Sequence, residues 1–160
     1  MNNPLKNNSV IRVEQLIKNF NPSLKVTLLS QSAKTAVEAA KALDCEVGAI
    51  VKSLILKADD TFLLCLIAGD MKCSFKKLKS IINKKNLSMA SAEEVKLETG
   101  FSIGGVSPVG HIKKLNIFID ESLNRFNYVF GAAGHPNCIF RISYKELIKI
   151  TDGSVIGISE

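Results

Sequence analysis

Three glycines and a proline lie within the seven residues Gly104-Gly105-Val106-Ser107-Pro108-Val109-Gly110. Glycine is found where the backbone needs a positive φ or must approach another group closely, and proline fixes φ and lacks an N–H donor. These residues exclude a helix interior and a central strand. The segment is therefore expected to be a shaped loop whose exposed amides could hold a small polar ligand. A plain turn between two elements is the alternative.

Lys52 is a second candidate because it interrupts an aliphatic segment, Ile50–Leu56, that reads as a strand. The alternation of a strand places Lys52 on one face with Leu54 and Leu56. Burial of an ammonium group there is costly unless an anion or a carbonyl group binds it. Because lysine is a good point-charge ligand for phosphate, we expect a functional role for Lys52. An outward-facing lysine on an amphipathic strand is the alternative.

A second run of small residues, Gly131–Pro136, is expected to form a loop and contains His135. The imidazole could orient water or contact an amine or hydroxyl of a substrate, whereas a surface histidine is the alternative. His111 carries a weaker form of the same argument, and Asp70 is more typical of a capping residue. No serine lies in a nucleophile elbow, so a Ser-His-Asp set cannot be assembled.

The chain carries a formal charge of +6, and much of the excess lies in one segment. A basic cluster favours an anionic partner such as a nucleic-acid backbone, although a solvated helix face is the alternative. The lysines concerned are Lys72, Lys76, Lys77, Lys79, Lys84 and Lys85.

Length and composition favour a single domain over residues 1–160 with an ordinary core, since 46% of the 160 residues are apolar. The longest apolar run, Phe62–Ala68, is far shorter than a membrane span of roughly 20 residues. The N-terminus has no apolar region typical of a signal peptide, so a cytoplasmic location is expected. None of the 4 cysteines forms a C-x-x-C motif, which favours buried free thiols, and we expect neither a metal nor another cofactor.

Apolar periodicity and turn residues give an α+β fold with a mixed, mostly antiparallel sheet packed with helices. No G-x-G-x-x-G follows a strand, which argues against a Rossmann fold. Residues 1–8 are expected to be disordered. Helices are expected over 9–20 and 35–43, and after the cap residues Ser74, Ser91 and Ser143; strands are expected over 24–29, 50–58, 62–68, 87–90, 116–120, 128–130 and 138–142.

The order of short blocks from about Ser30 to Gly153 resembles the YbaK/EbsC-like family, the free-standing relatives of the editing domain inserted in bacterial prolyl-tRNA synthetases. The matching blocks include Ser32-Ala33-Lys34-Thr35, Ile50-Val51-Lys52-Ser53-Leu54, Ala68-Gly69-Asp70, Phe75-Lys76-Lys77-Leu78, Ala92-Glu93-Glu94-Val95, Thr99-Gly100-Phe101, Gly104–Gly110, Asp120-Glu121-Ser122-Leu123 and Gly131–Pro136.

The resemblance implies a trans-editing hydrolase without a metal, which cleaves the ester between a small amino acid and the 3′ end of a mischarged tRNA. Alanine, cysteine, serine and threonine remain open as the amino acid, on proline tRNA, and a synthetase is a candidate partner. An inactive tRNA-binding module is the alternative, and a general nucleic-acid-binding protein ranks last because the chain has 2 tyrosines and no tryptophan.

The resemblance also assigns roles to individual residues. Ser53 replaces the threonine common in the family, and His135 departs from the usual late loop, so the choice of substrate stays open. The implied catalytic residues are Lys52, Gly104, Gly105 and Pro108; the substrate-binding residues are Ser53, Val106, Ser107, Gly131, Gly134 and His135; and the tRNA-binding residues are Lys72, Lys76 and Lys77.

Overall fold

The computed structural model describes residues 3–31 and 33–160. Its α-helices are α1 (Asn8–Phe20), α2 (Ala36–Leu43), α3 (Phe75–Ile82), α4 (Ala92–Thr99) and α5 (Tyr144–Thr151). Its strands are β1 (Val26–Leu28), β2 (Val51–Ala58), β3 (Thr61–Ala68), β4 (Leu87–Met89), β5 (Asn116–Asp120), β6 (Tyr128–His135), β7 (Cys138–Ser143) and β8 (Ser154–Ile156). Short 3-10 helices span Pro4–Lys6 (η1), Val47–Ala49 (η2) and Glu121–Arg125 (η3).

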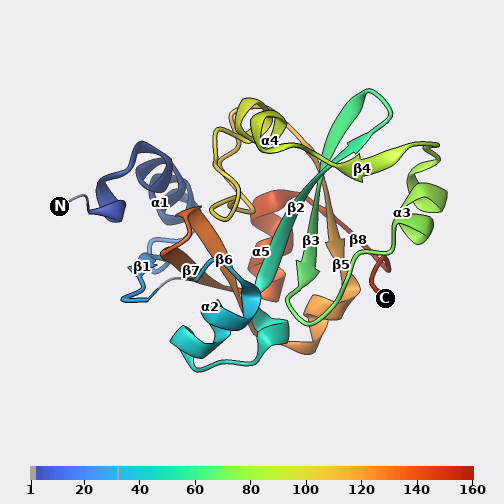
Figure 1. Ribbon diagram of the computed structural model, residues 1–160. Coiled ribbons are helices and arrows are strands. Elements are labelled where there is room, and N and C mark those ends of the chain that lie inside the picture. The colour runs from blue at the N-terminus through green and yellow to red at the C-terminus, as the bar shows by residue number, and fades with distance from the viewer. Residues whose placement is uncertain (1–2, 32) are drawn as a thin grey trace.

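The strands form two sheets that meet at the start of β2. One sheet has the order β4-β2-β3-β5-β8 and the other the order β1-β7-β6. The pairs β3–β5 and β5–β8 are parallel and the remaining pairs are antiparallel, so the expected mixed α+β fold is confirmed. A bridge between Ile50 and Phe130 joins the two sheets. In Figure 1 the small sheet and α1 lie at the left, α3 and β4 lie at the right, and β2 runs between them.

The helix starts lie where the sequence predicts them, because four side-chain caps form. The hydroxyls of Thr35, Ser74, Ser91 and Ser143 each accept a hydrogen bond from a backbone N–H in the first turn. Ser91 and Glu94 make a reciprocal capping box, and Gly100 ends α4 with a φ of +80°. Local chemistry therefore sets these boundaries.

The structure differs from the sequence-based expectation at three places. The small-residue run to His135 belongs to β6, interrupted by an irregularity between Ala132 and His135, and only Pro136 and Asn137 form the turn. Strand β8 was not expected; it is short and pairs only with β5. Pro4–Lys6 forms η1, with Asn3 as its cap, within the segment for which disorder was expected. Met1 and Asn2 lie outside the described residues.

Two apolar clusters lie on the opposite faces of β2. Val51 and Ile55 belong to the larger cluster, which β6, β7 and α1 complete. Leu56 belongs to the smaller cluster, with Leu54 packed against it and Leu78 of α3 within it. Free thiols occur at four positions, of which Cys65 and Cys138 are buried and Cys45 and Cys73 are half-buried. Within the described residues, every helix is too short or too polar to cross a membrane.

Asp120 at the end of β5 is a fully buried carboxylate that holds the C-terminal segment against the sheet. Its Oδ1 accepts hydrogen bonds from the N–H groups of Ile158 (2.8 Å) and Ser159 (3.0 Å), and its Oδ2 accepts one from Ser122 (3.1 Å). Burial raises the pKa of Asp120, but these hydrogen bonds outweigh burial and lower it. The charged form is therefore part of the folded structure.

Asp120→Asn is expected to lower the free energy of unfolding by about 2 kcal/mol near neutral pH, since hydrogen bonds to a charged acceptor are lost. The folded-state pKa is depressed, so the contribution of Asp120 is complete above the unfolded pKa of about 3.9 and is lost as the pH falls through the folded pKa. Urea unfolding at pH 7 and pH 3 measures both effects. The control Asp60→Asn, at an exposed position, should change neither the stability at pH 7 nor its loss at pH 3. If Asp120→Asn loses as much stability between pH 7 and pH 3 as the parent protein does, the proposed role of Asp120 is contradicted.

Candidate active site

A pocket lies along β2 where the two sheets meet. It has a volume of about 260 Å³, and α2, β4, β6, β7 and the loop between α4 and β5 contribute to its wall. Aliphatic side chains dominate this wall, including Val51, Ile55, Val106 and Ile139. Among the described lining residues, the polar side chains are Thr35, Lys52 and Ser53. An apolar pocket with a few polar groups is typical of a small-molecule site.

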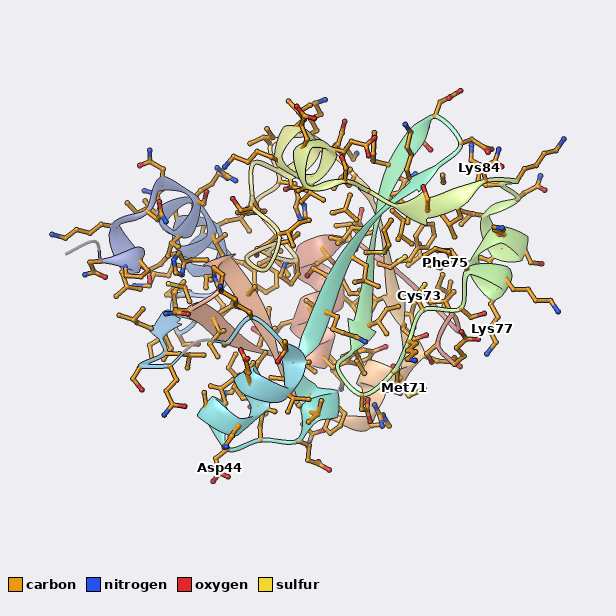
Figure 2. The ribbon with its side chains drawn as sticks, in the orientation of Figure 1. Asp44, Met71, Cys73, Phe75, Lys77 and Lys84 are labelled. Atoms are coloured by element: carbon orange, nitrogen blue, oxygen red, sulfur yellow. The ribbon has the colours of Figure 1, made fainter. Side chains whose placement is uncertain are left out.

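Lys52 lies at the wall with its ammonium group directed to the segment after β3. Nζ donates a hydrogen bond to the carbonyl of Met71, which leaves two of its three protons for another acceptor. Burial lowers the pKa of Lys52, the carboxylate of Asp70 opposes this, and the charge of Lys72 adds to the lowering. Asp70 is held by two hydrogen bonds from Arg125, of 2.7 and 2.9 Å. Figure 2 shows Met71 between β3 and α3, beside β2.

Ser53 follows Lys52 and presents a hydroxyl without a partner in the described part of the chain. Its Oγ is buried and makes no hydrogen bond, whereas the Thr35 hydroxyl is engaged in capping α2. An unpaired buried hydroxyl costs about 1–3 kcal/mol. A ligand that offers an oxygen or an amine to Ser53 would recover part of that cost.

The glycine loop, residues 101–110, enters the pocket through a tight turn. The N–H of Gly105 donates to the carbonyl of Ser102 (3.0 Å), and Gly104 has a φ of +92°. That φ is the one a type II turn requires at its third position, where glycine is favoured. Gly104 and Val106 line the pocket, and their N–H groups donate to nothing in the part of the chain that is described. These two amides, and not that of Gly105, are free for a ligand.

Two contacts between glycines and backbone or ring atoms hold the loop against β6. A Cβ atom on Gly105 would lie 2.9 Å from the backbone nitrogen of His135, and one on Gly131 would lie 2.9 Å from Cγ of Pro108. Real Cβ atoms do not approach this closely. The sequence singled out these glycines for a ligand, but here their missing side chains serve the packing of the loop on the strand.

Helix α1 holds the other end of the loop. Nε of Arg12 donates to the carbonyl of Gly110 (2.7 Å), and its guanidinium lies 4.9 Å from the centre of the Phe101 ring. Val13 is fully buried and packs against Gly110: a Cβ atom placed on Gly110 would be 3.6 Å from Cγ2 of Val13. The helix therefore fixes the loop that carries the free amides.

The structure brings part of the sequence-based site together at this pocket: Lys52, Ser53, Gly104, Val106 and Gly131 line it. His135 does not line it; its Nδ1 accepts a hydrogen bond from the N–H of Asn137 (3.0 Å) within the turn. Gly134 has a φ of +91° and packs against Ser9.

The remaining predicted residues lie behind the pocket or on the surface. Ser107 is fully buried, and its carbonyl accepts a hydrogen bond from Nε2 of His111 (2.7 Å). Burial lowers the pKa of His111. Lys72, Lys76 and Lys77 are exposed. Lys77 donates to the carbonyl of Ser159 (2.8 Å), and Figure 2 shows Lys77 near the lower end of α3 and Lys84 beyond the other end of this helix.

Sequence reasoning missed several wall residues that reach the pocket from distant elements. Ala36 and Ala39 come from α2, Met89 from β4, and Phe130 from β6. The alanines of α2 predict a helix, but the sequence around them does not indicate which face of that helix covers a pocket. Ile103 belongs to the glycine loop, and its 59% exposure could not be foreseen from the sequence.

Comparison with known proteins finds a match to one protein family. The model of the aminoacyl-tRNA editing domain matches residues 30–150. An uncharacterised protein, YwhH of Bacillus subtilis, is 34% identical over 137 residues, which cover 85% of this chain and 87% of that protein. A crystal structure of a candidate trans-editing enzyme for prolyl-tRNA synthetase superposes with a TM-score of 0.90 at 37% identity, covering 96% of this chain and 98% of the other.

The chain is also similar to one part of prolyl-tRNA synthetases. The proline–tRNA ligase of Thermosipho africanus is 37% identical over 101 residues, which cover 62% of this chain. The match spans only 18% of the ligase. Helix α1 lies outside the segment that the family model matches, although it contacts the glycine loop directly.

Arg12→Ala is expected to lower the free energy of unfolding by about 1–2 kcal/mol, because a partly buried charged hydrogen bond and a cation–π contact are lost. Hydrogen exchange at the amides of residues 104–110 should become faster, which reports the loosening of the loop. Urea unfolding and exchange by mass spectrometry measure the two effects. Lys18→Ala, at an exposed position of the same helix, is the control; equal exchange in both variants would contradict the anchoring role.

Proposed function

The chain belongs to the aminoacyl-tRNA editing domain family, and from this membership we propose that it is a trans-editing deacylase. The reaction is hydrolysis of the ester that joins a small amino acid to the 3′ end of a mischarged tRNA. Alanine, cysteine, serine and threonine on proline tRNA are the candidate substrates. The similarity to prolyl-tRNA synthetases supports proline tRNA as the carrier.

The observation that carries this proposal is the combination of a small aliphatic pocket with a cation at its edge. A pocket of about 260 Å³ with Val51, Ile55 and Val106 in its wall suits a side chain of a few heavy atoms. Lys52 also lines the pocket, and its side chain leaves β2 on the face opposite to Val51 and Ile55, so its positive charge lies at the pocket edge beside Met71. An ammonium with two free protons is suited to a phosphate of the terminal nucleotide, and the apolar volume is suited to the amino acid.

The chemistry needs little beyond positioning, since an aminoacyl ester is already activated. Water, or a group of the substrate itself, attacks the carbonyl carbon and creates an oxyanion. We assign the free N–H groups of Gly104 and Val106 to this oxyanion. Preorganised amide donors of this kind contribute typically about 10²–10³ in rate. In this proposal Gly105 and Pro108 keep the amides in place through their packing on β6.

Ser53 and Gly131 complete the proposed substrate-binding wall. The Ser53 hydroxyl lacks a protein partner in the described residues, so the substrate would supply one. Gly131 lines the pocket beside Phe130. His135 and Ser107 lie outside the wall, and we assign them a supporting role through the turn after β6 and the loop, in place of direct contact with the amino acid.

The proposed path of the tRNA leads from Lys52 to the outer side of α3. Lys72 lies close enough to Lys52 for its charge to lower the pKa of Lys52. Lys76 and Lys77 follow on the first turn of α3 and are exposed. Phosphate contacts from such lysines would position the acceptor end without reading its sequence.

Lys52→Ala is expected to lower kcat/KM on the best mischarged tRNA by roughly 100-fold, because the terminal nucleotide is no longer held in register. Lys52→Arg should also fail, since a planar guanidinium does not replace a compact ammonium. The measurement is deacylation of alanyl-, cysteinyl-, seryl- and threonyl-tRNA. Lys57→Ala, on the same strand but paired with Glu94 on the surface, is the matched control. Turnover of Lys52→Ala equal to that of the control would show that Lys52 is structural.

A further inference from the structure

Two thiols lie together where the chain leaves β3. Cys65, on the face of β3 that carries the smaller apolar cluster, is fully buried, and Cys73, just before α3, packs against the same cluster. The two thiols are close enough for a hydrogen bond between them. They belong to different segments, so the fold brings them together by turning the chain back over the sheet.

The backbone on both sides of this pair is held in place. Cys73 forms a bridge with Ser159 of the C-terminal segment, and the N–H of Glu160 donates a hydrogen bond to the carbonyl of Lys72 (2.8 Å). Cys65 belongs to β3, which is paired on one side with β2 and on the other with β5. The two sulfurs therefore meet from fixed backbone positions, as a disulfide requires.

Cys73 is the more reactive thiol of the two. It is half-buried, whereas Cys65 is fully buried. The hydrogen bond from Cys65 lowers the pKa of Cys73, and the positive charge of Lys52 lowers it further. Burial and the carboxylates of Asp120 and Glu160 oppose this lowering but do not reverse it. The contact with Cys73 and burial raise the pKa of Cys65, which keeps its proton. Since the thiolate is the form that reacts with an oxidant, Cys73 is the first to react.

We propose that hydrogen peroxide oxidises Cys65 and Cys73 to a reversible disulfide. The Cys73 thiolate attacks one peroxide oxygen: an S–O bond forms, the O–O bond breaks, and the departing hydroxide takes up the proton that Cys73 released. The sulfur of Cys65 then attacks that of Cys73: the S–S bond forms, the S–O bond breaks, and hydroxide leaves with the Cys65 proton. Two thiols are oxidised and one peroxide is reduced to two waters. A dithiol reductant reverses the reaction.

The disulfide acts on the site at Lys52 through Met71, and this part of the inference rests on the proposed function. The carbonyl of Met71 accepts the hydrogen bond from Nζ of Lys52. Figure 2 shows Met71 and Cys73 in succession along the segment between β3 and α3. A covalent bond is shorter than the contact between two thiols, and Cys65 is fixed in the sheet. Oxidation therefore draws the segment towards β3 and displaces the Met71 carbonyl, and Lys52 with it.

Peptide mapping tests the disulfide itself. The protein is treated with hydrogen peroxide, remaining thiols are blocked with iodoacetamide, and trypsin is added. Trypsin cuts after Lys72, between the two cysteines, so the disulfide joins peptide 58–72 to peptide 73–76. We expect this joined pair at the summed mass less two hydrogen atoms, and dithiothreitol should separate it. If the joined pair is absent and both cysteines are found blocked or overoxidised, the proposal is overturned.

Three variants separate this pair from the other thiols. Cys73→Ser and Cys65→Ala should each form no joined pair. Cys45→Ser is the matched control, because Cys45 is also half-buried, but burial and the carboxylates of Asp44 and Glu46 raise its pKa. The control should form the joined pair to the same extent as the wild type. Loss of the joined pair in the control would mean that Cys45 takes part in the oxidation and would overturn the direct reaction of Cys65 with Cys73.

The link to Lys52 has its own readouts. Backbone amide chemical shifts of the labelled protein should change at Lys52 and Met71 on oxidation. Deacylation kcat/KM should fall by roughly 10-fold or more, because a small displacement of a positioning group is costly, and dithiothreitol should restore it. Cys73→Ser should keep its untreated activity in peroxide. A disulfide that leaves the chemical shifts unchanged overturns the link. Failure of the proposed function is distinct: untreated protein then deacylates no mischarged tRNA, whereas the joined pair and the chemical shifts are measured without hydrolysis.

Discussion

The close approach of the glycine loop to β6 is the contact on which the pocket depends. Gly105 leaves no room for a side chain beside His135, and Gly131 leaves none beside Pro108. With these contacts in place, the turn at Gly104 faces β2 across the pocket. A wider separation would open the pocket to water and move the free amides away from Lys52. The glycines therefore contribute first by packing, and the amides that we assign to catalysis follow from that packing.

Strand β2 supplies the second constraint because its residues alternate between two faces. Val51 and Ile55 belong to the larger cluster, and Leu54 and Leu56 contact the smaller one. Lys52 lies opposite Ile67 and shares the face of the smaller cluster. Among the residues that the structure describes, the Ile50–Phe130 bridge is the only strand pairing between the two sheets, so the strand edge beyond it borders the pocket. One strand can thus offer an aliphatic wall to an amino acid and a cation to a nucleotide.

Local features of this fold could be predicted from the sequence, and its long-range contacts could not. Thr35, Ser74, Ser91 and Ser143 mark helix starts because a cap needs only the next three residues. Lys52 stood out because a strand pattern fixes its face. The sequence predicts a role for Gly105 at a ligand, but nothing in it shows that His135 lies against Gly105. The small residues up to His135 resembled a loop, yet β7 pairs with them as a strand. Met89 reaches the pocket through pairing of β4 with β2, which short-range patterns do not reveal.

The measurement that tests the account most directly is where a substrate analogue binds. Backbone amide chemical shifts of the labelled protein, recorded during titration with alanyl-adenosine joined by a 3′ amide, give the answer residue by residue. We expect the largest changes at Lys52, Ser53 and the amides of Gly104 and Val106. Another cavity, of about 430 Å³, lies elsewhere on the glycine loop and is lined by His111, Lys113 and Asp152 among others. Largest changes around that second cavity, with none at Lys52 or Gly104, would contradict the central claim.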